Sequence, residues 1–270
     1  MTLSDVIRKT IPHRARITAG VWSINLASHS WPVLKAYLTV LHGKPPSNMG
    51  ISGGHCYYDY QGRRIIAPQN AAGVFLEIFK DEVYERVWKP KPGDVVIDIG
   101  AYVGMFTVKA SLAVGPSGRV IAVEPCPENH TMMVRNCKGL TNVIPVQKAI
   151  MAQKGTGRLY FSKSAAANSM ITQWGTYVDV ETVTLDQLVS DLHLPWVNYI
   201  KLDAEGAEID VLKGATETLR RGTRIVIAAY HTTENGEKEI GTLKTMLRGA
   251  GYSVTQARGL RSYLNAEKAR

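Results

Sequence analysis

The chain has 270 residues, of which 45% are hydrophobic, and its three cysteines form no C-x-x-C pair, which argues against a disulfide framework or a thiolate zinc site. No apolar run reaches the roughly 18 residues needed to span a bilayer, and no signal-peptide core follows the first charged residues, so we expect a cytoplasmic protein. The formal net charge of +9 is concentrated at the ends, because residues 1–50 carry six Lys or Arg against one Asp, and residues 258–270 carry four against one Glu.

The first segment, residues 1–48, is predicted to form a basic helical extension that ends in the linker-like stretch "GKPPSNMG". Tryptophans and aliphatic residues interleave with its basic residues. This pattern favours either a helical lid on the main domain or an interfacial helix. In the second case residues 1–45 would contact a membrane surface or another acidic partner, and the protein would be membrane-peripheral.

Residues 49–90 are predicted to form a hairpin and a helix that lead into the core. In "HCYYDYQGRRIIA" two alternating stretches flank Gln61-Gly62, which is typical of a β-hairpin with its turn at these residues. A helix that carries Phe75, Leu76 and Phe79 is expected next.

From residue 91 onward, apolar strands alternate with amphipathic helices, which indicates a mostly parallel sheet covered on both faces. The sequence therefore predicts a doubly wound α/β domain over residues 91–270. Residues 157–183 interrupt the alternation and resemble a paired hairpin. The expected strands are "DVVIDIG", "RVIAVEP", "NVIPVQKAI", residues 197–202, "RIVIAAYH" and "YSVTQA", and the expected helices are 103–113, 127–138, 184–194, 207–221 and 236–249.

The first two core strands end in residues that suit a nucleoside ligand. In "IDIGAYVGMFT", Gly100 allows a sharp turn and Gly104 allows the helix to approach the sheet closely, while Asp98 suits a ligand with an ammonium group. The glycine spacing differs from the dinucleotide pattern G-x-G-x-x-G. Glu124 ends the second strand, where a carboxylate can accept the hydroxyl protons of a ribose. The combination favours S-adenosylmethionine over NAD.

Four blocks resemble, in the same order, the FkbM-type methyltransferases of the class I S-adenosylmethionine-dependent fold: "VVIDIGAYVGMFT", "RVIAVEPCPENHTMMVRN", "VTLDQLV" and "YIKLDAEGAEIDVLKGA". The resemblance covers roughly residues 82–232. It implies a Rossmann-like seven-stranded sheet with an antiparallel last hairpin, and methyl transfer, usually to a hydroxyl oxygen. The strand ending "IAAYH" departs from the family, because Ala229 stands where an acid is usual, and this weakens a metal or base role for that strand.

The resemblance also implies where the cofactor lies. The methionine end would face the glycine turn, and the ribose would face Glu124. The implied cofactor-binding residues are Asp98, Gly100, Tyr102, Gly104, Glu124, Pro125 and Asp203.

The fourth core strand ends in the acidic stretch "KLDAEGAE". Methylation of a hydroxyl requires that its proton be removed and its oxygen aligned, and a carboxylate can accept the proton or hold a cation. The catalytic candidates are Asp203, Glu205 and His231. Their spacing is too loose to assign a divalent metal. Glu208 falls in the first turn of the next helix, where its charge interacts favourably with the helix dipole.

We therefore predict an S-adenosylmethionine-dependent methyltransferase that acts on a hydroxyl of a small molecule, glycan or lipid-linked sugar. An RNA methyltransferase that uses the basic ends is disfavoured, because the middle of the chain is near neutral and a base-methylase motif is missing. A non-catalytic nucleoside-binding scaffold is the other alternative. Asn168, Ser169 and Trp174, in the insertion, are candidates for substrate contact.

Overall fold

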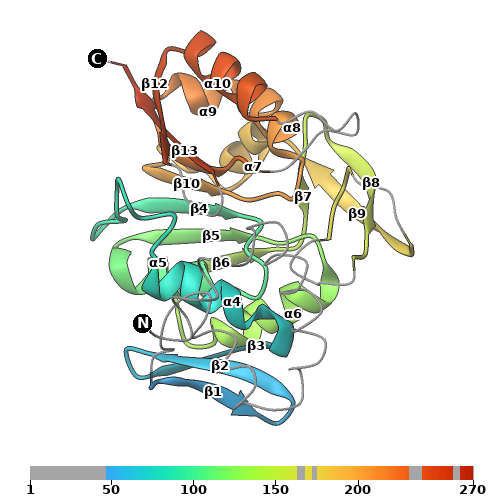
Figure 1. Ribbon diagram of the computed structural model, residues 1–270. Coiled ribbons are helices and arrows are strands. Elements are labelled where there is room, and N and C mark those ends of the chain that lie inside the picture. Colours follow the sequence, from blue (N-terminus) through green and yellow to red (C-terminus); the bar gives the residue numbers. More distant parts are fainter. Residues whose placement is uncertain (1–46, 163–167, 172–174, 231–238, 258–261, 270) are drawn as a thin grey trace, which may run out of the picture. The chain divides into compact units, whose positions relative to one another are not determined.

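The computed structural model describes residues 47–162, 168–171, 175–230, 239–257 and 262–269. The chain divides into two compact units, Met1–Glu82 and Val83–Arg270 (Figure 1). The helices expected within residues 1–45 lie outside the described residues. No helix in the described ranges is both long enough and apolar enough to cross a membrane.

The first unit contains a three-stranded antiparallel sheet in the order β1-β2-β3, formed by Met49–Ser52, His55–Tyr60 and Arg63–Pro68. Gln61 and Gly62 both have positive φ angles, 46° and 76°, as a two-residue hairpin turn requires, so the predicted hairpin is confirmed. Strand β1 is not predicted from the sequence, because it begins inside a stretch that reads as a linker. The unit also contains the short helices η1 (Gln69–Ala71), α4 (Ala72–Phe75) and η2 (Leu76–Lys80).

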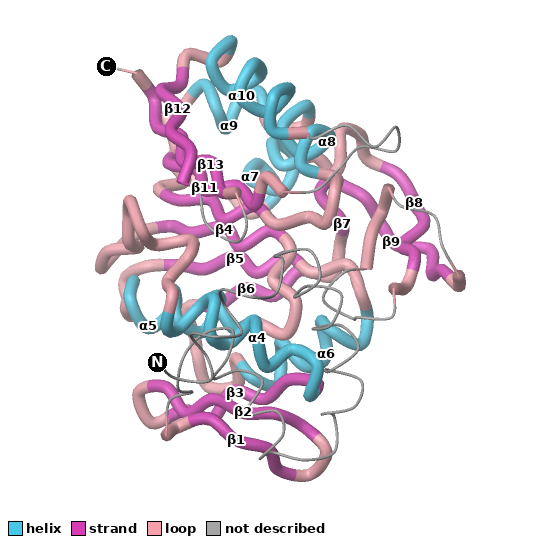
Figure 2. The backbone as a smooth tube through the Cα atoms, viewed as in Figure 1, coloured by secondary structure: helices cyan, strands magenta, loops and turns pink. Residues whose placement is uncertain are grey.

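The second unit is built on a seven-stranded sheet in the order β12-β13-β11-β10-β4-β5-β6 (Figure 2). Neighbouring strands from β11 to β6 are parallel, whereas β13 is antiparallel to both β11 and β12. The doubly wound sheet and its antiparallel last hairpin are thus confirmed. The strands are β4 (Val95–Ile99), β5 (Arg119–Val123), β6 (Val143–Val146), β10 (Tyr199–Leu202), β11 (Arg224–Ala228), β12 (Tyr252–Ala257) and β13 (Tyr263–Lys268).

Helices cover both faces of this sheet. Val95, Ile97 and Ile99 of β4 share one hydrophobic cluster with α7, α8, α9 and α10. Asp98 alternates with these residues and therefore projects from the opposite face, where it meets Thr107 of α5. The helices are α5 (Met105–Val114), α6 (Pro127–Asn136), α7 (Leu185–Asp191), α8 (Glu208–Lys213), α9 (Thr216–Arg220) and α10 (Ile240–Gly249).

The helix predicted over residues 207–221 is divided into α8 and α9. Gly214 lies at the break, and a Cβ there would lie 2.4 Å from the carbonyl oxygen of Met151, so the backbone approaches closely. The Asp186 carboxylate accepts hydrogen bonds from Glu217 N and Thr218 N and so satisfies two amides in the first turn of α9. Tertiary contacts therefore end one helix and begin the next.

The third predicted strand also divides. Its first half is β6, at the edge of the large sheet, and its second half is β7 (Ala149–Ile150), which pairs with β9 in a separate sheet. Strands β8 (Gly155–Tyr160) and β9 (Tyr177–Val183) are antiparallel, which confirms the paired hairpin in the insertion. The insertion sheet has the order β7-β9-β8.

Candidate active site

The topology of the large sheet identifies its ligand-binding edge. From β4 the chain adds β5 and β6 on one side, and it later adds β10 and β11 on the other. In open α/β sheets, ligands bind at the carboxyl ends of the strands where the order reverses. This point lies between β4 and β10. The ends of β4, β5 and β10 carry the Gly100 turn, Glu124 and Asp203, three features expected from the sequence.

Asp98 is completely buried within β4 and has two partners inside the protein. Its Oδ1 lies 2.8 Å from Nζ of Lys201, the residue directly beside it in β10, and its Oδ2 accepts from the Thr107 hydroxyl at 2.6 Å. The Lys201 ammonium also donates to the carbonyl oxygen of Gly100 at 2.7 Å. The ammonium group that faces Asp98 is thus that of Lys201, and this pair holds the start of the turn.

The turn after β4 contains three residues with left-handed backbone conformation. Gly100, Tyr102 and Gly104 have φ angles of 73°, 53° and 83°. A Cβ on Gly100 would lie 1.8 Å from the backbone oxygen of Asp203, so only glycine allows the β4 turn and the loop after β10 to meet. A Cβ on Gly104 would lie 2.9 Å from the side chain of Met133 in α6.

Glu124 is buried immediately after β5 and accepts three hydrogen bonds. The donors are Tyr102 N at 2.8 Å, Cys126 N at 3.0 Å and the Asn129 side-chain amide at 3.4 Å. Burial raises the pKa of Glu124 to about 7, although these hydrogen bonds and the Lys201 charge act in the opposite direction. Pro125 is half-buried and leads into α6. The Glu124 carboxylate therefore fixes the turn that carries Tyr102.

Asp203 follows β10 and is the acceptor for two tyrosines. Its Oδ2 accepts from the Tyr84 hydroxyl at 2.6 Å, and its Oδ1 accepts from the Tyr230 hydroxyl at 3.4 Å. Tyr84 is buried, and burial together with the Asp203 charge raises the pKa of the Tyr84 phenol well above its usual range. The phenol therefore keeps its proton and remains a donor to Asp203.

The two glutamates after Asp203 differ in their surroundings. Glu205 is half-buried and has a φ of 49°, an uncommon conformation for a residue with a side chain. Glu208 is completely buried at the start of α8, and its carboxylate accepts from Ala204 N at 2.9 Å and Gly206 N at 3.0 Å. Glu208 therefore holds the loop in addition to beginning the helix. His231 lies outside the described residues.

Comparison with known proteins now identifies the class. The family model described as "Methyltransferase FkbM domain" matches residues 98–254, more than half of the chain. The chain belongs to the FkbM methyltransferase family. It is thus an S-adenosylmethionine-dependent methyltransferase, and the matched region contains the ends of β4, β5 and β10.

Relatives of this FkbM-family methyltransferase include two named enzymes. The chain is 26% identical over 215 residues to 31-O-demethyl-FK506 methyltransferase FkbM of Streptomyces tacrolimicus. The aligned region covers 67% of this chain and 81% of that protein. It is 28% identical over 139 residues to hexuronic acid methyltransferase AglP of Haloferax volcanii, covering 51% of this chain and 56% of AglP. Among solved structures, fibrillarin of Aeropyrum pernix with bound S-adenosyl-L-methionine has a TM-score of 0.48 and 14% identity, covering 79% of this chain and 83% of fibrillarin.

Several residues of this candidate site are not predicted from the sequence. Lys201 was visible as the one charge in an apolar strand, but its partner could not be read from the sequence. Tyr84 is separated from Asp203 by 119 positions and has no local signal. Thr107, which donates to Asp98, and Tyr230, which donates to Asp203, are not predicted either. Asn168 and Ser169, predicted to contact substrate, hydrogen-bond to Cys126 and to the Glu205 carbonyl oxygen, and their contact with substrate stays a prediction. Trp174 lies outside the described residues.

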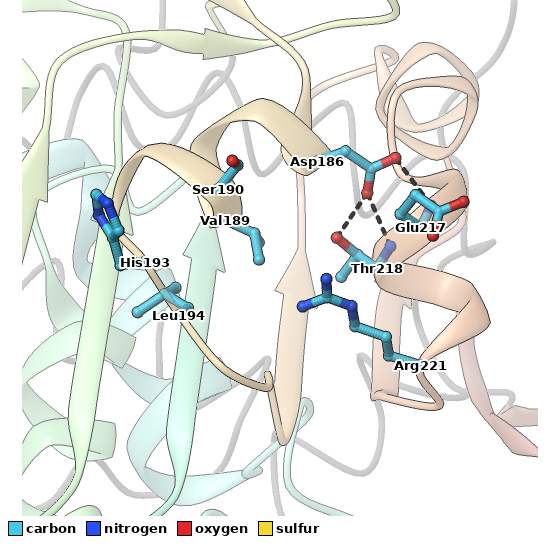
Figure 3. Close-up of a pocket in the computed structure, with 8 residues that line it drawn as sticks. All are labelled: Asp186, Val189, Ser190, His193, Leu194, Glu217, Thr218 and Arg221. Atoms are coloured by element: carbon cyan, nitrogen blue, oxygen red, sulfur yellow. Dashed lines mark hydrogen bonds between the residues drawn. The ribbon is translucent and has the colours of Figure 1, made fainter.

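Metal-binding groups and pockets away from this edge of the sheet are the other features that could bear on function. The described ranges contain no group of three or more His, Cys, Asp or Glu that could hold a metal ion. A small hollow of about 120 Å³ lies between α7 and α9, and Figure 3 shows Asp186 on its wall with both carboxylate oxygens bonded to α9. His193 and Leu194, which also line the hollow, precede β10, so the hollow lies toward the opposite ends of the strands.

Proposed function

We propose that this methyltransferase transfers a methyl group from S-adenosylmethionine to a hydroxyl oxygen of a small molecule or sugar. The observation that carries the proposal is the contact between the Gly100 turn and the Asp203 backbone, because it brings a carboxylate to the edge where the cofactor is expected. The printed names of two relatives support the acceptor class. One is named as a methyltransferase of 31-O-demethyl-FK506, a name that refers to a methyl group on oxygen, and the other is named for a hexuronic acid.

The residues at this edge fit the cofactor. A carboxylate offers about four acceptor sites, and Glu124 uses three of them within the protein, one through a long bond of 3.4 Å. The Glu124 carboxylate can therefore still accept from ribose hydroxyls, most readily if Asn129 turns away. Asp98, Gly100, Tyr102, Gly104 and Pro125 shape the proposed methionine and ribose positions around it. When bound, S-adenosylmethionine supplies an electrophilic methyl group on its sulfonium sulfur.

We assign Asp203 the role of proton acceptor for the substrate hydroxyl. The cofactor would supply the methyl carbon: its bond to the sulfonium sulfur would break as the hydroxyl oxygen bonds to it, and S-adenosylhomocysteine would leave. Asp203 would take the proton of that hydroxyl on a carboxylate oxygen. Tyr84 and Tyr230 donate to the two oxygens of that carboxylate and orient it. Glu205, in the same loop, and His231 remain the alternative acceptors.

The N-terminal segment is proposed to contact an acidic partner or a membrane surface through its basic residues within 1–45. This role is compatible with a cytoplasmic, membrane-peripheral enzyme acting on a lipid-linked sugar. A salt-dependent affinity for vesicles that contain anionic lipid, lost when residues 1–45 are removed, would support it. An RNA acceptor is disfavoured, because the net positive charge is concentrated at the two ends and the middle of the chain is near neutral.

The experiment that tests the proposed function separates binding from chemistry. Calorimetric titration with S-adenosylhomocysteine measures cofactor binding, and labelled S-adenosylmethionine incubated with a cell extract reports methyl transfer to its acceptors. We expect the unmodified protein to bind S-adenosylhomocysteine and to label hydroxyl-bearing compounds. Asp203→Asn should keep the binding and lose most of the transfer. Absence of S-adenosylhomocysteine binding by the unmodified protein would overturn the proposal.

A further inference from the structure

Part of the insertion lies against the candidate active site. Within the described segment 168–171, Ser169 pairs with Tyr160 at the end of β8: Tyr160 N donates to Ser169 O at 2.9 Å, and Ser169 N donates to Tyr160 O at 3.1 Å. The Asn168 side-chain oxygen accepts from Ser162 N at 3.0 Å. The backbone position of Ser169 is therefore set by the insertion sheet and does not depend on its own side chain.

The Ser169 side chain makes a buried contact with the acidic loop. Ser169 is 2% exposed, and its hydroxyl donates to the carbonyl oxygen of Glu205 at 2.7 Å while accepting from Ile171 N at 3.1 Å. A serine hydroxyl has one proton to donate, and here it is given to Glu205. The peptide that receives it belongs to a residue in the uncommon left-handed conformation, with a φ of 49°.

The loop between Asp203 and Glu208 is thus held from two directions. Glu208 binds the amides of Ala204 and Gly206, and Ser169 binds the carbonyl between them. The Glu208 contacts come from the same strand-to-helix connection. The Ser169 contact comes from the insertion, where Ser169 pairs with Tyr160 of β8, so it attaches the loop to the insertion sheet.

The residue next to Ser169 reaches the other side of the site. Asn168 Nδ2 lies 3.5 Å from Sγ of Cys126, whose own backbone amide donates to Glu124. Cys126 also belongs to the hydrophobic cluster of the insertion. Adjacent residues of the insertion therefore contact the loop after β5 and the loop after β10, the two strands that flank β4.

We propose that Ser169 is a positioning residue: through the Glu205 carbonyl it sets the loop that carries Asp203 and Glu205 relative to the cofactor acid Glu124. This inference rests on the proposed function, in which that loop faces the transferred methyl group. A displacement of about 1 Å at a reacting group is enough to slow a reaction by up to a hundredfold. The insertion then helps to set the positions of the catalytic residues.

The test compares Ser169→Ala with Ser169→Thr, which restores a hydroxyl, and with Ser190→Ala, an exposed serine of α7, as the matched control. Hydrogen–deuterium exchange of the peptide 199–212 reports the loop directly. In Ser169→Ala we expect faster exchange there, unchanged S-adenosylhomocysteine affinity, and about a tenfold lower maximal rate of labelled-methyl transfer to extract acceptors. The KM for S-adenosylmethionine should change less than about threefold, because the Glu124 contacts remain.

The outcomes separate this inference from the proposed function. If the unmodified protein fails to bind S-adenosylhomocysteine, the proposed function falls. If it binds, and Ser169→Ala changes neither loop exchange nor maximal rate, the positioning role alone is wrong. A rise in KM without a fall in maximal rate also contradicts it. If Ser169→Ala is insoluble, Ser169→Cys, of similar size and with only a weak donor, should give the same pattern, and normal activity in that variant would refute the role.

Discussion

Nζ of Lys201 lies 2.8 Å from Oδ1 of Asp98, and the side chains are 4% and 0% exposed on adjacent strands at the centre of the sheet. The same ammonium binds the carbonyl oxygen of Gly100. A buried charge that loses its partner is strongly destabilising, because neither water nor another charge replaces the interaction. The pair therefore links the stability of the sheet to the conformation of the β4 turn.

Lys201→Met should lower the free energy of unfolding by about 3–5 kcal/mol, since among the described residues it leaves the buried Asp98 carboxylate with the Thr107 hydroxyl as its remaining donor. Urea denaturation followed by circular dichroism measures the loss. The control is Lys213→Met, which removes an exposed ion pair with Asp210 and should cost at most about 1 kcal/mol. Equal effects of the two substitutions would show that Lys201 makes no special contribution.

The pH dependence of cofactor binding should follow Glu124. Its pKa of about 7 means that the carboxyl is largely neutral below pH 7 and ionised above it. The ionised form is the stronger acceptor for ribose hydroxyls. The dissociation constant for S-adenosylhomocysteine should therefore fall between pH 6 and pH 8, by up to about tenfold. Calorimetry across this range measures it, and Glu124→Gln should bind weakly and without this pH dependence.

The raised pKa of Glu124 also predicts how the stability of the folded protein changes with pH. Its pKa in the folded protein lies above the ordinary value of 4.5, so the folded chain binds more protons than the unfolded chain between about pH 4.5 and 7. The contribution of Glu124 to the stability of the cofactor-free protein should fall as the pH rises through this range. The difference in stability between the unmodified protein and Glu124→Gln, measured by denaturation at several pH values, should show that trend. A difference that rises with pH would contradict the buried, proton-retaining carboxyl.

Much of the fold could be predicted because its signals are local. Apolar strands such as "VVIDIG" and "RVIAVE" alternate with amphipathic helices, and the family resemblance supplied the antiparallel hairpin formed by β12 and β13. The misplaced boundaries arise where tertiary contacts override local pattern. Gly214 ends α8 because the backbone of Met151 lies against it, and β7 leaves the third strand because it pairs with β9.

The candidate site was predictable only in part, for a similar reason. The residues at strand ends, Gly100, Glu124 and Asp203, were identifiable because strand ends and turns are visible in the sequence. Their partners were not, since Lys201 reaches Asp98 only through the register of β10 with β4. Tyr84 reaches Asp203 only through the packed fold. Pairing between distant segments is decided by the assembled core and leaves no pattern in the neighbouring residues.

Tyr84→Phe should weaken methyl transfer while leaving S-adenosylhomocysteine binding nearly unchanged. It removes the hydroxyl that donates to Asp203 at 2.6 Å, a hydrogen bond to a charged group worth about 1.5–3 kcal/mol. Asp203 would then be oriented less firmly, and the transfer rate should fall by about tenfold. Tyr230→Phe is the matched control, because its hydroxyl lies 3.4 Å from Asp203 and should matter less. A larger effect at Tyr230 would place the orienting contact there instead.

Gly100→Ala should be among the most damaging single substitutions at the proposed cofactor edge of the sheet. The added Cβ would lie 1.8 Å from the backbone oxygen of Asp203, at a φ of 73°, so the β4 turn and the loop after β10 could not keep their contact. We expect a loss of stability at least about 3 kcal/mol larger than for Gly139→Ala, together with a loss of S-adenosylhomocysteine binding. Gly139 has a similar φ of 81° with nothing within 4 Å of its Cβ position, so it reports the backbone strain alone. Thermal denaturation and calorimetry of both variants make the comparison, and equal losses would mean that the close approach to Asp203 does not constrain the site.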